Sequence, residues 1–380
     1  MNTLMLELVD ESTAVVHANL RGGPVTKLGR SQLNPASCFD HFCLLKKISI
    51  DINKMSNGSC FTAGRIVYSC FVSFNWVVFF FFLSSCEHGY IKCYPPIYNG
   101  HLFSPTDRVK LGSPIPGDVA FRICAVRETF EESGVLLVVP KGEESTITRL
   151  ILPWDKNVLS KWRSLVINNP ANFIKMCKEL QCLPNIWALH EWGNWLTPTG
   201  VYGKHRRYDT AFYICCLQET PYTLQDEKEI IHFKWSTPSE VLHRYKSKEL
   251  WIAPPQLYDL GRMCRFPALK ELHRFARQRS LEGCEQWLPI NLISDNYIIS
   301  ILPGDDLYLE KVDCSGKRDG PLITDKSLKE LQSSCSDLHR FISQDLYTVS
   351  LQVNISPKYN HLQPLSIQAV DADFKTSSKL

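Results

Sequence analysis

Residues 127–135 read Arg127-Glu128-Thr129-Phe130-Glu131-Glu132-Ser133-Gly134-Val135, and this stretch decides how the rest of the chain is interpreted. On a helix, Glu128 lies three and four residues before Glu131 and Glu132, so the three carboxylates can converge near one edge. Because packed like charges repel, the simplest compensation is a hard divalent cation with oxygen ligands. Arg127 lies four residues before Glu131 and can orient it. The alternative for the same spacing is a solvated amphipathic helix with Glu and Arg on its surface.

The residues around this stretch predict a helix followed by a strand. The pattern predicts a helix over 119–133, which Gly134 ends as the glycine favoured just past a last helical turn. A short β-branched strand is predicted at 135–139. Residues 144–180 are expected to be helical, with a break at Pro170. Elsewhere, strands are predicted at 39–47, 186–189, 210–217, 229–235, 287–293 and 297–302, and helices beginning at Pro238 and near 254–278.

The pattern R-E-x-x-E-E-x-G followed by a hydrophobic residue is the second half of the Nudix box, and the chain resembles Nudix hydrolases. Four later stretches resemble the Nudix motif 19 type of acyl-coenzyme A diphosphatase: residues 186–198, 206–212, 251–256 and 302–306. The resemblance implies an α/β fold. We expect a Nudix-type α-β-α sandwich with a mixed sheet, a helical insertion and extra C-terminal elements.

The same resemblance implies an activity, a cofactor and roles for the acidic residues. The activity is hydrolysis of the diphosphate bond of coenzyme A (CoA) and acyl-CoAs to adenosine 3′,5′-bisphosphate and (acyl-)4′-phosphopantetheine. Glu128, Glu131 and Glu132 would bind Mg²⁺ or Mn²⁺, with Arg127 as an orienting ion pair. The general base would be Glu132 or Glu229, which precedes Trp235 in an E-x5-W pattern. The alternative for Glu229 is a surface carboxylate on a strand.

A basic cluster and a group of tryptophans are candidates for substrate recognition. Lys204, Arg206 and Arg207 form the densest basic cluster, and arginine forks bind phosphate oxygens well. The cluster is interpreted as the site for the CoA 3′-phosphate or diphosphate, or else as a solvated loop. The tryptophans either stack an adenine and line an acyl channel or belong to the core; they are Trp187, Trp192 and Trp195.

The first half of the Nudix box does not match the pattern. In an uninterrupted box its glycine and acidic residue would fall at Ser113 and Val119, and neither fits. In this branch of the family a long insertion is expected to split the box, which places the first half near 66–71, where no Pro-Gly-Gly turn stands. The charge-free residues 66–86 begin there. They are interpreted as a membrane helix, as a buried strand or hairpin, or as sequence foreign to the fold.

This mismatch leaves two rival functions open. One is a catalytically silent Nudix-fold protein that binds a CoA-like ligand or a partner. The other is a diphosphatase for a different nucleoside diphosphate derivative, because the glutamates specify a metal and a diphosphate but not the leaving group. A membrane-tethered variant is also considered; we expect no membrane location, because residues 378–380 read as a peroxisomal matrix address, and matrix import and a spanning helix are different routes.

The chain is divided into parts by its change in character at residue 117. Residues 1–116 are a divergent N-terminal part of the Nudix fold with a doubtful apolar segment at 66–100. Residues 117–313 form the Nudix core with a helical insertion at about 144–180. Residues 314–380 are expected to be a weakly structured tail.

Bulk composition and the C-terminus narrow the partners and the compartment. The net charge of +3 is too small to indicate a nucleic acid partner. The 15 cysteines contain no CxxC pair, which favours buried thiols in a reducing compartment over a zinc site. The terminal Ser378-Lys379-Leu380 is a receptor-read peroxisomal address. We therefore expect an import receptor as a partner and the peroxisomal matrix as the location, with the mitochondrion as the alternative.

Overall fold

The structure of the protein, a computed structural model, describes residues 4–8, 42–51, 67–68, 77–78, 117–141, 154–198, 208–217, 221, 232–309 and 321–365. The helices of the described part are α2 (Gly117–Ser133), α3 (Lys156–Asn168), α4 (Asn172–Glu179), α5 (Pro238–Lys246), α6 (Pro254–Met263), α7 (Leu269–Arg279) and α8 (Leu328–Ser333). The strands of the main sheet follow the order β10 (Gln286–Trp287), β7 (Leu189–Leu196), β8 (Tyr208–Leu217), β2 (Phe42–Asp51), β1 (Leu4–Leu8) and β9 (His232–Ser236).

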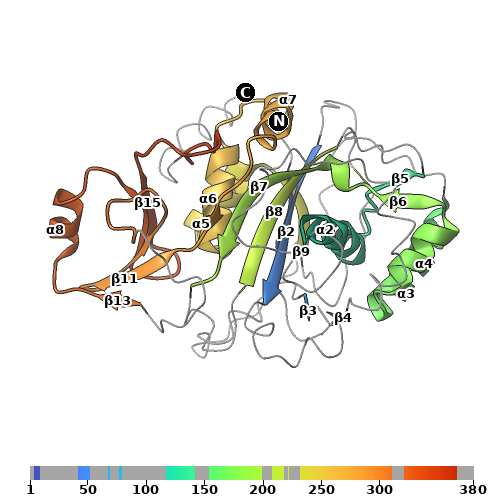
Figure 1. Ribbon diagram of the computed structural model, residues 1–380, viewed down its shortest axis with the longest axis horizontal. Helices are drawn as coiled ribbons and strands as arrows, with labels where there is room; N and C mark the ends of the chain where they lie inside the picture. The colour runs from blue at the N-terminus through green and yellow to red at the C-terminus, as the bar shows by residue number, and fades with distance from the viewer. Residues whose placement is uncertain are drawn as a thin grey trace.

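The main sheet is mixed, as expected. Strand β1 is parallel to β2 and β10 is parallel to β7, whereas β8 pairs antiparallel with both β2 and β7. In Figure 1, α2 lies on one side of the central strands and α5 and α6 lie on the other. The α/β sandwich is therefore confirmed.

Strand β8 shows how the sequence produces the two packed faces. Ala211 and Tyr213 belong to the same buried cluster as residues of α2 and α4. Phe212 and Ile214 belong instead to the cluster built with α5, α6 and α7. Because successive side chains of a strand point to opposite faces, one apolar run fills both cores.

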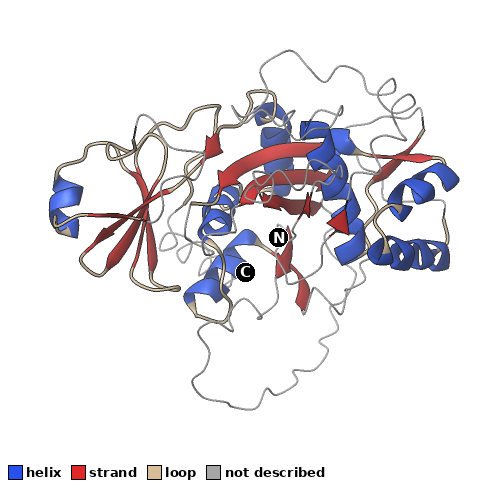
Figure 2. Cartoon of the chain, turned by 60° about the horizontal axis from the view of Figure 1, so that its bottom comes forward, coloured by secondary structure: helices blue, strands red, loops and turns tan. Residues whose placement is uncertain are grey.

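The helical insertion is confirmed, together with its break at Pro170. Helix α3 ends before Pro170 and α4 begins after it, since proline cannot continue a hydrogen-bonded helix. A short antiparallel pair of strands, β5 (Val138–Pro140) and β6 (Cys182–Pro184), closes the insertion. Viewed as in Figure 2, these helices lie at one end of the molecule and a second sheet lies at the other.

The C-terminal region differs from the expectation of a weakly structured tail. Its sheet follows the order β13 (Leu322–Ile323), β11 (Ile290–Ser294), β12 (Tyr297–Ile301), β14 (His339–Ser343) and β15 (Val349–Val353). The expectation was wrong for 321–365, because these strands are short and pair across long stretches of chain, as Ile299 does with Ile342. Such short strands show little of the alternation of apolar and polar residues by which a strand is recognised in a sequence. Residues 366–380, including Ser378, Lys379 and Leu380, lie outside the described residues.

The charge-free segment is described in two short pieces. Strand β3 (Val67–Tyr68) pairs with β2 and with β4 (Val77–Val78), so these pieces agree with the hairpin interpretation. The rest of 66–86 lies outside the described residues. In the described part of the chain, no helix has the length and apolar character needed to cross a membrane.

Candidate functional site

Helix α2 is buried on nearly all sides, including its charged residues. Arg127 is 1% exposed, and Glu128 and Glu132 are each 5% exposed. Its apolar residues Phe121 and Phe130 are equally enclosed. The alternative of a solvated surface helix is therefore wrong. Charges are rarely buried in this way unless they are paired or bind an ion.

The guanidinium of Arg127 joins two of the candidate carboxylates. Its Nη2 lies 2.9 Å from Glu128 Oε1, and its Nη1 donates to Glu131 Oε2. Burial acts to lower the pKa of Arg127, but the charges of Glu131, Cys124 and Glu128 and the hydrogen bond to Glu131 together outweigh that effect and leave the pKa well above its ordinary value. The Cys124 thiol, whose pKa burial raises well above its usual range, donates to Glu128 Oε1 at 3.3 Å. The ion pair between Arg127 and Glu131 that the spacing predicts is thus present.

The donor set can be compared with what a metal ion would need. Carboxylate oxygens are the ligands that Mg²⁺ and Mn²⁺ prefer, so the chemistry of Glu128, Glu131 and Glu132 fits. The arrangement of these side chains differs from that of a metal site, because Glu128 and Glu131 both bind Arg127. Among the residues that the structure describes, no three His, Cys, Asp or Glu side chains are grouped so as to hold a metal.

The C-terminal end of α2 is held by a residue that the sequence reasoning missed. Arg163 of α3 donates through Nε to the carbonyls of Phe130 (3.1 Å) and Glu131 (3.0 Å). Its Nη2 donates to the carbonyl of Glu132 at 2.8 Å. A signal was available: the last turn of α2 contains no basic residue, although helix ends favour one there. Gly134 then takes a positive φ of 74°, as expected for the residue after the helix.

The other candidate residues are the three tryptophans, which the structure describes, and the basic cluster with Glu229, which lies outside the described residues. Trp192 and Trp195 are core residues, at 0% and 3% exposure, and the guanidinium of Arg262 lies 4.0 Å from the ring centroid of Trp192. Trp187 is half-buried and packs beside Val119. The candidates Lys204, Arg206, Arg207 and Glu229 lie outside the described residues.

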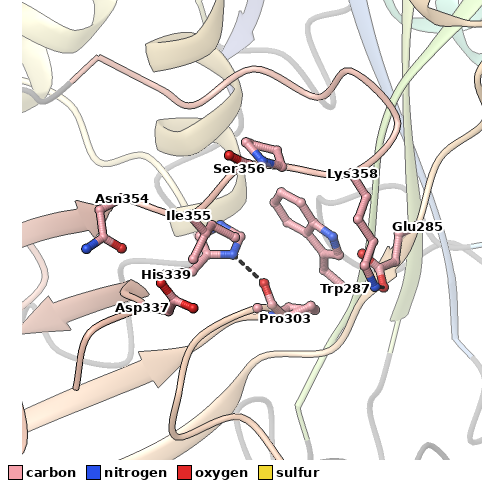
Figure 3. Close-up of a pocket in the computed structure, with 11 residues that line it drawn as sticks. Glu285, Trp287, Pro303, Asp337, His339, Asn354, Ile355, Ser356 and Lys358 are labelled. Carbon is pink, nitrogen blue, oxygen red and sulfur yellow. Dashed lines mark hydrogen bonds and ion pairs between the residues drawn. The ribbon is translucent and has the colours of Figure 1, made fainter. Parts of the chain in front are cut away.

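A cavity of about 410 Å³ lies away from α2, where β10 meets the C-terminal sheet (Figure 3). Four of its polar side chains, those of Glu285, Lys358, His339 and Asn354, already have partners within the protein. Lys358 Nζ lies 3.2 Å from Glu285 Oε1, and His339 Nδ1 lies 2.7 Å from the carbonyl oxygen of Pro303. The side-chain amide of Asn354 accepts from the backbone N–H of Leu338 through Oδ1 and donates to the carbonyl of Ser336 through Nδ2. None of the candidate carboxylates lines this cavity, so it is not assigned to diphosphate chemistry.

Two family models together match most of the chain. The family model described as "NUDT19 Nudix domain" matches residues 11–263, and the "NUDT19 C-terminal domain" matches residues 291–354. The second range corresponds to the C-terminal sheet.

Three relatives carry the description "Acyl-coenzyme A diphosphatase NUDT19", and each is 41% identical to this chain. The Gallus gallus protein aligns over 92% of this chain and 94% of its own length. For the Xenopus laevis protein the shares are 97% and 98%. For the Homo sapiens protein both shares are 66%.

Proposed function

The chain belongs to the NUDT19 Nudix family, and from this premise we propose that it hydrolyses the diphosphate bond of CoA and acyl-CoAs. The products are adenosine 3′,5′-bisphosphate and (acyl-)4′-phosphopantetheine. The observation that carries the proposal is the buried arrangement on α2, in which Arg127 binds Glu128 and Glu131. A buried charge cluster costs free energy, and clusters of this kind are typical of functional sites.

The residues of α2 would divide metal binding, orientation and proton transfer among them. Glu128, Glu131 and Glu132 would hold Mg²⁺ or Mn²⁺, which when bound neutralises charge on the diphosphate. Arg127 keeps the carboxylates of Glu128 and Glu131 oriented, because its guanidinium binds both of them. Glu132 or Glu229 accepts the proton of the attacking water.

Substrate recognition and location are part of the same proposal. Lys204, Arg206 and Arg207 bind the phosphates of CoA, for which arginine forks are suited. The terminal Ser378-Lys379-Leu380 is read by an import receptor and directs the chain to the peroxisomal matrix. The mitochondrion is the alternative location.

Two observations favour a second candidate function. Two of the three candidate ligands are bound to Arg127, and the first half of the Nudix box lacks its glycine turn. A silent Nudix-fold protein that binds a CoA-like ligand accounts for both facts. A diphosphatase for a different nucleoside diphosphate derivative shares the same helix.

The test is metal-dependent product release. The purified chain is incubated with Mg²⁺ and either CoA or a medium-chain acyl-CoA, and adenosine 3′,5′-bisphosphate is quantified. Glu131→Gln and Glu132→Gln should each abolish release, whereas Glu179→Gln, at an exposed position on α4, should not change it. No release from the folded chain would support the silent protein. Release from a nucleotide sugar or dinucleotide alone would support the other diphosphatase.

A further inference from the structure

The last turn of α2 contains no basic residue to bind its terminal carbonyls. The C-terminal end of a helix carries partial negative charge on its unsatisfied carbonyls. Here that end also carries Glu131 and Glu132, and it has no basic residue. Arg127 pairs with Glu131, but the last turn itself supplies no cation to its carbonyls.

The missing cation comes from the helical insertion. Arg163 is 9% exposed and reaches α2 from α3, more than thirty residues further along the chain. It donates to the carbonyls of Phe130, Glu131 and Glu132 at 3.1, 3.0 and 2.8 Å. A planar guanidinium can satisfy several acceptors in fixed directions, whereas a lysine ammonium acts as a single point charge.

We infer that Arg163 is a positioning residue for the reaction: it fixes the last turn of α2 and thereby the placement of the Glu131 and Glu132 carboxylates. The inference rests on the proposed function. The carbonyls that Arg163 binds belong to these two glutamates themselves, so a shift of either peptide unit moves its carboxylate. Catalytic groups must stay within about 0.5 Å of their working geometry, so a small movement is costly.

The role differs from general stabilisation, and one neighbour allows the difference to be measured. Trp162 lies beside Arg163 on α3, is half-buried and packs against the cluster that includes α2. Trp162→Leu weakens the packing of α3 against this cluster without removing a carbonyl partner. It is therefore the matched control for Arg163→Met, while Arg163→Lys keeps the charge and loses the fork.

The experiment measures metal binding as well as activity. Mn²⁺ binding to each variant is titrated by electron paramagnetic resonance, and kcat and KM for CoA are measured with Mg²⁺ at 25 °C. Arg163→Met should weaken Mn²⁺ binding and lower kcat, each by roughly tenfold or more, with KM little changed, since loss of a group that orients ligands costs about 10–100-fold. Arg163→Lys should fall between wild type and Arg163→Met. Trp162→Leu should lower the melting temperature and leave Mn²⁺ binding and kcat near wild type.

The outcomes separate this inference from the proposed function. If Arg163→Met binds Mn²⁺ as wild type does, or if Trp162→Leu weakens binding equally, Arg163 has only a structural role and the inference is overturned. If wild type binds Mn²⁺ but does not cleave CoA, the proposed substrate fails while weaker Mn²⁺ binding in Arg163→Met still supports the inference. Should Arg163→Met not fold, Arg163→Lys decides: unchanged Mn²⁺ affinity and kcat would overturn the inference.

Discussion

Arg127 determines the character of α2, because one buried guanidinium binds two carboxylates of its own helix. Such an arrangement is costly to assemble and more costly to break, since removal of one partner leaves charges enclosed. The residue type and its spacing from Glu131 were readable from the sequence, and the ion pair is present. Its burial was not readable, because burial depends on which segments pack around the helix.

Loss of the Arg127 side chain should therefore destabilise the protein strongly. We expect Arg127→Met to lower the free energy of unfolding by about 3–5 kcal/mol, as for other broken buried pairs. Urea denaturation followed by circular dichroism measures it. Added Mg²⁺ should return part of the loss if the carboxylates then bind the metal.

The matched control is an exposed ion pair. Arg244 and Glu249 lie 3.3 Å apart with side chains 33% and 56% exposed. Arg244→Met should change the unfolding free energy by at most about 1 kcal/mol, because water screens such pairs. Equal effects of the two substitutions would show that burial does not make the loss of the Arg127 side chain more costly.

His339 makes the free energy of unfolding depend on pH. His339 Nε2 lies 3.0 Å from the Tyr258 hydroxyl, its Nδ1 lies 2.7 Å from the Pro303 carbonyl, and burial lowers its pKa to about 4. The unfolded chain takes up a proton near pH 6.5 and the folded protein only near pH 4. Stability should therefore fall as pH drops from about 6.5 to 4, by about 3 kcal/mol for this residue.

Urea denaturation at pH 7.5 and pH 4.5 measures this dependence. His339→Asn should be less stable than wild type at pH 7.5, but it should lose less on acidification. His190, whose pKa burial also lowers to about 4, contributes to the slope that remains. An unchanged slope in His339→Asn would show that His339 does not carry the dependence.

At the scale of elements, local signals were predictable and long-range pairing was not. The break at Pro170 and the helix that begins at Pro238 follow from the chemistry of proline within a few residues. The helix expected near 254–278 is instead two helices, α6 and α7, separated around Pro267. The same proline rule, applied there, would have predicted the division. Arg163 was missed for a different reason, since its partners lie in another element.

The C-terminal sheet depends on one buried ion pair between distant segments. Asp305 and Arg340 are both fully enclosed, and the carboxylate accepts from Arg340 Nε and Nη2 at 2.6 Å. Asp305 Oδ2 also accepts from the backbone N–H of His339 at 2.8 Å. Asp305→Ala should thus cost about 3–5 kcal/mol. Hydrogen exchange should show the loss first in β12 and β14.

A milder variant separates charge from hydrogen bonding. Asp305→Asn retains an acceptor and should cost less than Asp305→Ala. If both variants keep wild-type protection in β12 and β14, the ion pair does not join these strands.

At the scale of the whole molecule, the two sheets share a core. Phe341 of β14 is 2% exposed and belongs to the same cluster as Leu242 of α5 and Tyr258 of α6. The Tyr245 hydroxyl donates to the carbonyl of Leu346 at 2.8 Å, which adds a polar contact across the junction. The division into a Nudix part and a C-terminal part is therefore one of topology, with a common interior.

Phe341→Ala should destabilise both sheets together. We expect a loss of about 3–5 kcal/mol, typical for a large aromatic removed from a core. Amide hydrogen exchange should accelerate in α5 and α6 as well as in β11 and β12. Ile323→Ala, at a position 78% exposed, should stay within about 0.5 kcal/mol of wild type. Faster exchange confined to the C-terminal sheet would indicate two independent folding units.

The double use of strand β8 limits how this chain can change in length during evolution. Ten residues of β8 pair in register with β2, and neighbours such as Tyr213 and Ile214 serve opposite cores. Deletion of a single codon within the strand would exchange the two faces beyond that point and place each side chain in the wrong core. Insertions and deletions in descendants of this gene should therefore accumulate in the connections around β8 and be purged within it.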